Sequence, residues 1–359
     1  MIVQQNAPFE SPFFDENCQI LRTKNTVSSQ LKRVYSGVNA SNHSSVFIPM
    51  KATWLALALA SGGFAQAIVP VSDKTFEFRS GFWINLDRFL YEQALADPAP
   101  AAVAPEWTAA LDYYRKKFIK GSQPSGEIVE LHDRLSDLES VASLKGSNLD
   151  PELIAILEAA APVYRARWWA AHDQGNRAWI RAVSPMLSKY SPDLKKDLVK
   201  AYATAWPSMP IRVDVSEYAD WAGAYTTIDP SHITISSAAK SNQGDAALEM
   251  LFHEASHTII QKVRDTMGAE AQTQNKLYRN RDLWHIILFY TTGEIVREHL
   301  KGYVPYAFKN NLYDGRWQGV PEILEKDWKP YLDGKVDMTT AIRRLIVDYG
   351  VDLPTKAKP

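Results

Sequence analysis

The stretch of sequence that decides the fold and the chemistry is AALEMLFHEASHTII, residues 246–260. Its apolar residues recur at helical spacing, which predicts a helix over about residues 245–263. Within it, His253, Glu254 and His257 form the pattern H-E-x-x-H. On a helix, residues i and i+4 project from one face, so both imidazoles can reach one metal ion. Composition alone would give this pattern in about one chain in a hundred.

Glu254 stands beside the first histidine and is predicted to act on water rather than to bind the ion. Zinc lowers the pKa of a water molecule that it binds, and a neighbouring carboxylate can take the proton. Two imidazoles with a carboxylate favour Zn²⁺ among the divalent ions. The pattern therefore predicts a zinc site. The alternative is a helix in which two histidines are simply packed.

A catalytic zinc site needs a third protein ligand. The next stretch with helical spacing, about residues 282–300, is mostly apolar and contains Glu294. A buried carboxylate is costly unless it is paired or bound to a metal, and Gly293 before it lets two helices approach closely. Glu294 is therefore the predicted third ligand. Glu298 and Glu270 are weaker alternatives.

Two further candidates lie in the same stretch. Tyr290, four residues before Glu294, is predicted on the same helical face as a donor to a developing oxyanion; the alternative is a core tyrosine. His285 lies nine residues before Glu294, which places it on the opposite face of a straight helix. We expect it to reach the metal, as an oxyanion partner or a support for the ligands, only if the helix bends or begins later.

The residues around this motif predict the architecture. From about 82 to 205 the apolar spacing is mostly helical, with Pro and Gly between segments. Residues 211–236 alternate between apolar and polar and predict two or three short antiparallel strands. Residues 302–319, rich in Gly, Tyr and Asn, predict a long surface loop, with helices following near 320–328 and 338–348. The expected fold class is α+β, predominantly α-helical, with a small antiparallel sheet.

The metal motif and its neighbourhood resemble the gluzincin branch of the zincin-like metallopeptidases. The resemblance rests on His253-Glu254-x-x-His257 and Glu294 and, with the strands before them, spans residues 211–300. It implies a zincin-like fold in which zinc is bound by His253, His257 and Glu294. It also implies that Glu254 is the general base.

The resemblance further implies how substrate binds. In this family an edge strand above the active helix pairs with an extended peptide, a known mode of recognition. Residues 232–236 fit that strand. The expected function is thus an exported zinc metallopeptidase with a peptide or protein substrate.

A function of another class is the alternative. The chain would then be a non-catalytic periplasmic binding or interaction protein with a structural or vestigial metal. A structural site is closed by four protein ligands, and His285 is the residue that would close it.

The N-terminal part predicts export. Residues 50–67 combine a basic start, a short apolar run and an A-x-A pattern, which indicates a signal peptide. Its apolar run is too short for a membrane span of about 20 residues. Residues 1–49 are interpreted as an artefact of the assigned start or as a disordered tail. The predicted location is periplasmic or secreted. The remaining chain is predicted to be one domain of three parts, residues 68–205, 206–300 and 301–359.

Composition excludes several classes of function. Basic and acidic residues nearly balance, 40 against 41, so no basic excess favours nucleic acid as a partner. Hydrophobic residues are 46% and charged residues 23%, as in soluble globular proteins. The single cysteine, Cys18, excludes an intramolecular disulfide framework and cysteine-ligated metal sites.

Overall fold

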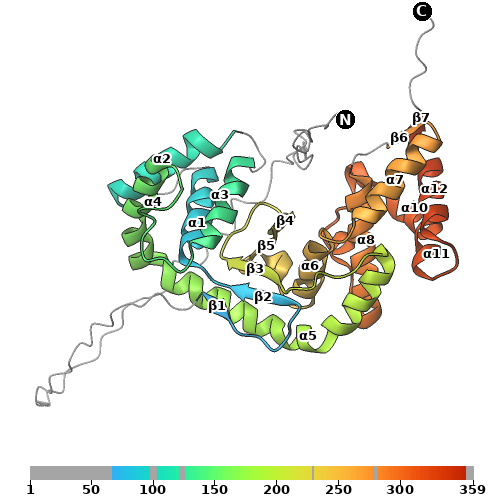
Figure 1. Ribbon diagram of the computed structural model, residues 1–359, viewed down its shortest axis with the longest axis horizontal. Helices are drawn as coiled ribbons and strands as arrows, with labels where there is room; N and C mark the ends of the chain where they lie inside the picture. The colour runs from blue at the N-terminus through green and yellow to red at the C-terminus, as the bar shows by residue number, and fades with distance from the viewer. Residues whose placement is uncertain (1–66, 98–102, 121–125, 229, 279–281, 353–359) are drawn as a thin grey trace, which may run out of the picture. The chain divides into compact units, whose positions relative to one another are not determined.

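Figure 1 shows a computed structural model of the chain, which describes residues 67–352 apart from 98–102, 121–125, 229 and 279–281. All the described residues fall within one compact unit, residues 66–359. The expected signal segment, except Ala67, and residues 1–49 lie outside the described residues. The described part is a mostly helical α+β structure with a five-stranded mixed sheet.

The sheet has the strand order β1-β2-β3-β5-β4. Its strands are β1 (Ile68–Val69), β2 (Phe76–Arg79), β3 (Ile211–Ser216), β4 (Ala224–Ile228) and β5 (Ser231–Ser236). β3 runs parallel to β2 and β5, whereas β1 and β4 are antiparallel to their neighbours. The prediction of two or three short antiparallel strands over residues 211–236 is therefore confirmed for the strands themselves and for the β4–β5 pair, and it was wrong for β3, which pairs parallel to β5. The chain passes from β3 to the outer strand β4 and returns as β5, so β5 inserts parallel to β3.

The strand proposed for substrate pairing is also placed differently. Residues 232–236 belong to β5, which pairs on one side with β3 and on the other with β4. All five are buried, as in an interior strand that is covered on both faces. The edge strand at this side of the sheet is β4. Alternation in a sequence identifies a strand, but it carries no information about the order of the strands.

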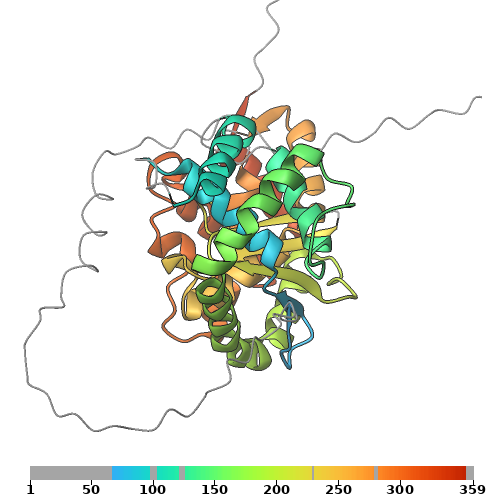
Figure 2. The ribbon, with the colours of Figure 1, turned by 90° about the vertical axis from the view of Figure 1, so that its left-hand side faces the viewer.

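The first group of helices covers one side of the sheet, as Figures 1 and 2 show. Pro105 and Pro151 stand at the first positions of two of them, where a proline has no hydrogen bond to lose. These helices are α1 (Phe82–Leu95), α2 (Pro105–Phe118), α3 (Gly126–Asp137) and α4 (Pro151–Tyr164). The helical spacing over residues 82–205 thus corresponds to helices in the structure.

The longest helix continues from α4. A π-helical turn (Arg165–Trp169) leads into α5 (Ala170–Tyr202), which runs from the first helices past the sheet toward the second group (Figure 1). Asn176 in α5 is fully buried and donates to Ser80 and Asn85, so it joins α5 to the start of α1. Helix α5 packs against the strands and against α6 and α8, and together these elements form the hydrophobic core.

The second group of helices carries the metal motif. It comprises α6 (Asp245–Ser256), α7 (Gln261–Thr273), α8 (Leu283–His299), α9 (Tyr306–Lys309), α10 (Val320–Asp327), α11 (Lys329–Leu332) and α12 (Met338–Tyr349), with two 3-10 turns, Lys240–Asn242 and Gly315–Trp317, and a hairpin of β6 (Lys276–Tyr278) with β7 (Gly350–Asp352). Residues 302–319 are not a plain surface loop as predicted. They include α9 and a 3-10 turn, and Tyr306, Tyr313 and Trp317 are buried. Among the described residues, none of the helices combines the length and apolar character that a membrane span requires.

A buried polar network ties α3 to the sheet. His232 in β5 contacts Asp133 of α3 through Nδ1 at 2.9 Å and Asp214 of β3 through Nε2. Arg212 also contacts Asp214. Despite the cost of burial, the two carboxylates raise the pKa of His232 to about 9. Burial alone would raise the pKa of Asp214. The hydrogen bond from His232, with the charges of His232 and Arg212, outweighs burial and lowers this pKa to about 2.

This network predicts a defined pH dependence of stability. The pKa of His232 is above its ordinary value of 6.5, so its contribution is complete below about pH 6.5 and is lost as the pH rises through about 9. The contribution of Asp214 is complete above its ordinary value of 3.8 and is lost as the pH falls through about 2. Both are present between about pH 4 and 6.5. Urea unfolding of the parent and of His232→Gln should differ by about 2–3 kcal/mol more at pH 6 than at pH 9. Parallel stability curves would contradict this.

Candidate metal centre

Helix α6 carries the motif through the interior of the protein. Every residue from Ala246 to Ser256 is buried, which explains the nearly continuous apolar run. His253 is 1% exposed and Glu254 is 4% exposed. His257 follows the last residue of α6 and keeps helical backbone angles, φ −56° and ψ −30°. The i, i+4 relation of the two histidines is therefore preserved at the end of the helix.

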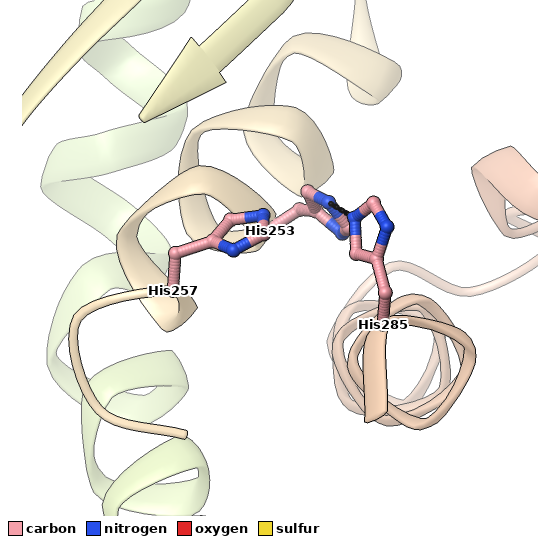
Figure 3. A group of neighbouring side chains, drawn as sticks. All are labelled: His253, His257 and His285. Atoms are coloured by element: carbon pink, nitrogen blue, oxygen red, sulfur yellow. Dashed lines mark hydrogen bonds between the residues drawn. The ribbon is translucent and has the colours of Figure 1, made fainter. Parts of the chain in front are cut away.

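A third histidine joins them from α8. One ring nitrogen each of His253, His257 and His285 lies within 4.8 Å of the others. The Nε2 atoms of His253 and His285 are 3.2 Å apart, and Figure 3 shows the two rings meeting across the gap between their helices. Nitrogens bound to a tetrahedral zinc at 2.0–2.1 Å lie about 3.3 Å apart. The Nε2 atoms of His253 and His285 thus have the spacing that a shared ion requires.

The electrostatics of the three rings also suit a metal. Burial, with the other imidazoles close by, holds the pKa of His253 and His257 well below its ordinary value. Burial lowers the pKa of His285 to about 4. All three rings are therefore neutral at neutral pH, which is the form that offers a lone pair to a metal. The donor set fits zinc, which accepts three histidines and an open position.

Glu254 lies at the edge of this group and is held by the sheet. Its Oε2 accepts a hydrogen bond from Thr226 Oγ1 at 2.7 Å and lies 3.9 Å from His257 Nε2. Burial raises the pKa of its carboxyl to about 8. Because Thr226 belongs to β4, the edge strand passes directly beside the motif. The candidate base is thus adjacent to the histidines without being one of the grouped ligands.

Glu294 is not brought to the histidines. It is 2% exposed, and its Oε2 accepts a hydrogen bond from Arg297 one turn further along α8. Nine residues separate it from His285, about 13 Å along a helix axis. The cost of burying this carboxylate is thus offset by an arginine, one of the two solutions that burial allows.

The weaker carboxylate candidates also have other partners. Glu270 forms a two-pronged ion pair with Arg343, with N···O distances of 3.0 and 3.1 Å. Glu298 is exposed and lies 3.8 Å from Lys329. Neither belongs to the histidine group.

Tyr290 is turned to a different partner. Its hydroxyl donates to Glu325 Oε1 at 2.6 Å, and its ring is 1% exposed. It is a core residue of α8 in this structure. His285, in contrast, reaches the motif because α8 begins at Leu283 and places this residue in the first turn. The helix begins only one residue later than predicted, so its start hardly changes the position of His285. His285 was predicted to lie away from the metal because it was placed relative to Glu294, and Glu294 is not part of the histidine group.

Aromatic residues that the sequence did not single out surround the histidines. Phe289 packs on His253 with ring centroids 3.9 Å apart, and Trp284 stacks on His285 at 5.1 Å. Tyr306 stacks on Phe289, and Trp317 meets His285 edge-on at 6.4 Å. Phe289 is four residues after His285 on α8, a spacing that could have indicated its proximity. Tyr306 and Trp317 come from residues 302–319, and no local pattern connects them to the motif.

An acidic pocket of about 330 Å³ adjoins this region. Its lining includes Glu92, Glu217, Asp220 and Ser241, and none of the three histidines. Ser241 is also a hydrogen-bond partner of the Tyr306 hydroxyl. The pocket is therefore a neighbour of the metal centre and not the centre itself.

Comparisons of the chain with protein-family models, with curated proteins and with solved structures gave no significant match.

Proposed function

We propose that the chain is a zinc-dependent hydrolase whose ion is held by His253, His257 and His285. The observation that carries the proposal is a group of three neutral imidazoles, one buried (His253) and two partly buried (His257 and His285), next to a buried carboxylate, Glu254. Three histidines with an open position form an established catalytic zinc set. This ligand set differs from the gluzincin set, in which a glutamate is third, so the proposal rests on the geometry rather than on that resemblance.

The residues divide the work of hydrolysis as follows. A bound zinc ion lowers the pKa of water and polarises a carbonyl group. A cation held by the three histidines would lower the pKa of Glu254 from about 8 and so favour its ionised form. The carboxylate would then take a proton from water and return it to the leaving group, which is general acid–base catalysis. Thr226 holds Glu254 by donating to Oε2, so the carboxylate is oriented before substrate arrives. Phe289 packs on His253 and Trp284 packs on His285, so these aromatic rings shield part of the two imidazoles from bulk water.

The size of the histidine group supports catalysis over a structural metal. Within the described residues, the group contains three ligands and no fourth His, Cys, Asp or Glu. A structural zinc site is closed by four protein ligands, whereas a catalytic site keeps one position open. His285, the residue expected to close a structural site, is needed here as the third ligand.

We further propose that the substrate is a peptide or protein segment in extended form. The edge strand β4 lies beside Glu254 through Thr226, and an edge strand can pair with an extended chain. This role falls to β4 rather than to residues 232–236. A periplasmic or secreted location is part of the proposal and rests on the signal-like residues 50–67.

Removal of the metal tests this function. The chelated full-length chain should lose cleavage of unfolded protein substrates and regain it when zinc is returned. Because zinc binds the folded state, about 1,000-fold excess over its Kd should also add about 4 kcal/mol to the free energy of unfolding. Cleavage is measured by mass spectrometry of the products, and stability by thermal unfolding with and without zinc. Cleavage that continues in the metal-free chain would contradict the proposal.

A further inference from the structure

Glu249 is a buried carboxylate that the proposed mechanism does not use. It lies on α6 one helical turn before His253, and it is 0% exposed. A carboxylate is tolerated in such a place only when donors or cations surround it. Its neighbours therefore show which part of the chain it holds.

Those neighbours come from residues 302–319, which we call the covering segment. Glu249 Oε2 accepts a hydrogen bond from the backbone N–H of Tyr306 at 2.8 Å, at the first residue of α9. The hydroxyl of Tyr303 lies beside the same carboxylate. A backbone N–H at the start of a helix has no partner inside that helix. Glu249 supplies one and so fastens the covering segment to α6.

The contact is tight from the side of α8 as well. A Cβ atom on Gly293 would lie 2.7 Å from Pro305 Cβ and 3.1 Å from Glu249 Oε1. Real Cβ atoms do not approach other carbons so closely. Glycine at this position is therefore what allows α6, α8 and the covering segment to meet around Glu249.

This anchor determines where two aromatic residues lie. The ring of Tyr306 stacks on Phe289 at 6.0 Å and 17°, and Phe289 in turn packs on His253. Trp317, near the other end of the segment, contacts His285. Both rings border the metal centre from the side of the covering segment.

We propose that Glu249 is a positioning residue that anchors the covering segment to the metal-binding helix and so sets Tyr306 and Trp317 beside the metal centre. The segment is bounded by Gly302 and Gly319, with φ of +84° and +77°, which favour glycine. Between these two turns, Glu249 provides a polar attachment to α6. The effect on catalysis rests on the proposed function, whereas the attachment itself does not.

The test compares Glu249→Ala with Glu249→Gln in the zinc-loaded full-length chain. Amide hydrogen exchange should rise at least tenfold over residues 303–308 in Glu249→Ala, as expected when a buried N–H loses its acceptor. Exchange in α6 and α8 and the zinc affinity should stay within threefold of the parent. The value of kcat/KM should fall at least tenfold. Glu249→Gln should remain near the parent in all of these, because its amide oxygen accepts the same N–H.

Unchanged exchange over residues 303–308 in Glu249→Ala would overturn the proposal. So would an equal rise of exchange throughout α6 and α8, which indicates a merely structural role. If Glu249→Ala does not fold, Glu249→Asp decides, because it keeps the carboxyl group but is one methylene shorter than the side chain that accepts from the Tyr306 N–H. The same local rise over residues 303–308 supports the proposal, and its absence overturns it. A parent chain without hydrolysis contradicts the proposed function but leaves the exchange comparison decisive.

Discussion

Glu254→Gln is expected to bind zinc as the parent does and to lose hydrolysis by a factor of about 10²–10⁴, the usual contribution of a general base. The substitution keeps the size of the side chain. It also keeps an oxygen that can accept the hydrogen bond from Thr226, so the β4–α6 contact should survive. What the amide cannot do is take a proton. The effect should therefore appear in kcat, with little change in zinc content or in thermal stability.

Thr226→Val provides the matched control for this prediction. It leaves the carboxylate in place but removes the hydroxyl that orients it. We expect a smaller loss of activity, about tenfold, in line with one hydrogen bond to a charged group. Both variants are compared by steady-state kinetics and by metal analysis of the same preparations. Full activity in Glu254→Gln would remove Glu254 from the mechanism.

His285→Ala is expected to weaken zinc binding by at least about 100-fold. Loss of a direct ligand should cost more than loss of a residue that only supports one, for which 10–100-fold is typical. Glu294→Gln should bind zinc within threefold of the parent, because the structure pairs Glu294 with Arg297 and places it away from the histidines. The affinities are measured by competition with a chelator of known zinc affinity.

The comparison of these two variants separates two ligand sets. His172→Ala serves as the control for loss of a histidine, since His172 lies at the start of α5, contacts Tyr164 of α4 and is not part of the histidine group. It should leave zinc affinity unchanged. Zinc lost from Glu294→Gln and retained by His285→Ala would support the glutamate as third ligand and contradict the site described above.

The local parts of the structure were predictable from the sequence. The apolar spacing around residues 246–260 identifies the helix that carries His253 and Glu254, and the helices α10 and α12 begin at the predicted residues 320 and 338. These features depend on neighbours within one or two turns. The H-E-x-x-H spacing is of the same kind, since a helix alone aligns its two histidines.

The parts that failed depend on a choice between alternatives that the sequence pattern itself does not make. β3, β4 and β5 were recognisable as strands, but their order depends on which strand β5 joins, and alternation is the same in either case. Similarly, a buried glutamate can be bound to a metal or paired with a cation. Arg297, only three residues after Glu294, resolves this in the structure. The spacing of three residues places Arg297 on the same helical face as Glu294, so the sequence could have indicated this pairing.

The measurement that tests the central claim most directly is the position of zinc in a crystal of the zinc-loaded full-length chain. Anomalous diffraction at the zinc edge locates the ion independently of the protein atoms. We predict one ion bound at about 2.0–2.1 Å by a nitrogen of each of His253, His257 and His285, with a position left open beside Glu254. An ion bound by Glu294 in place of His285, or no ion among the three histidines, would contradict the account.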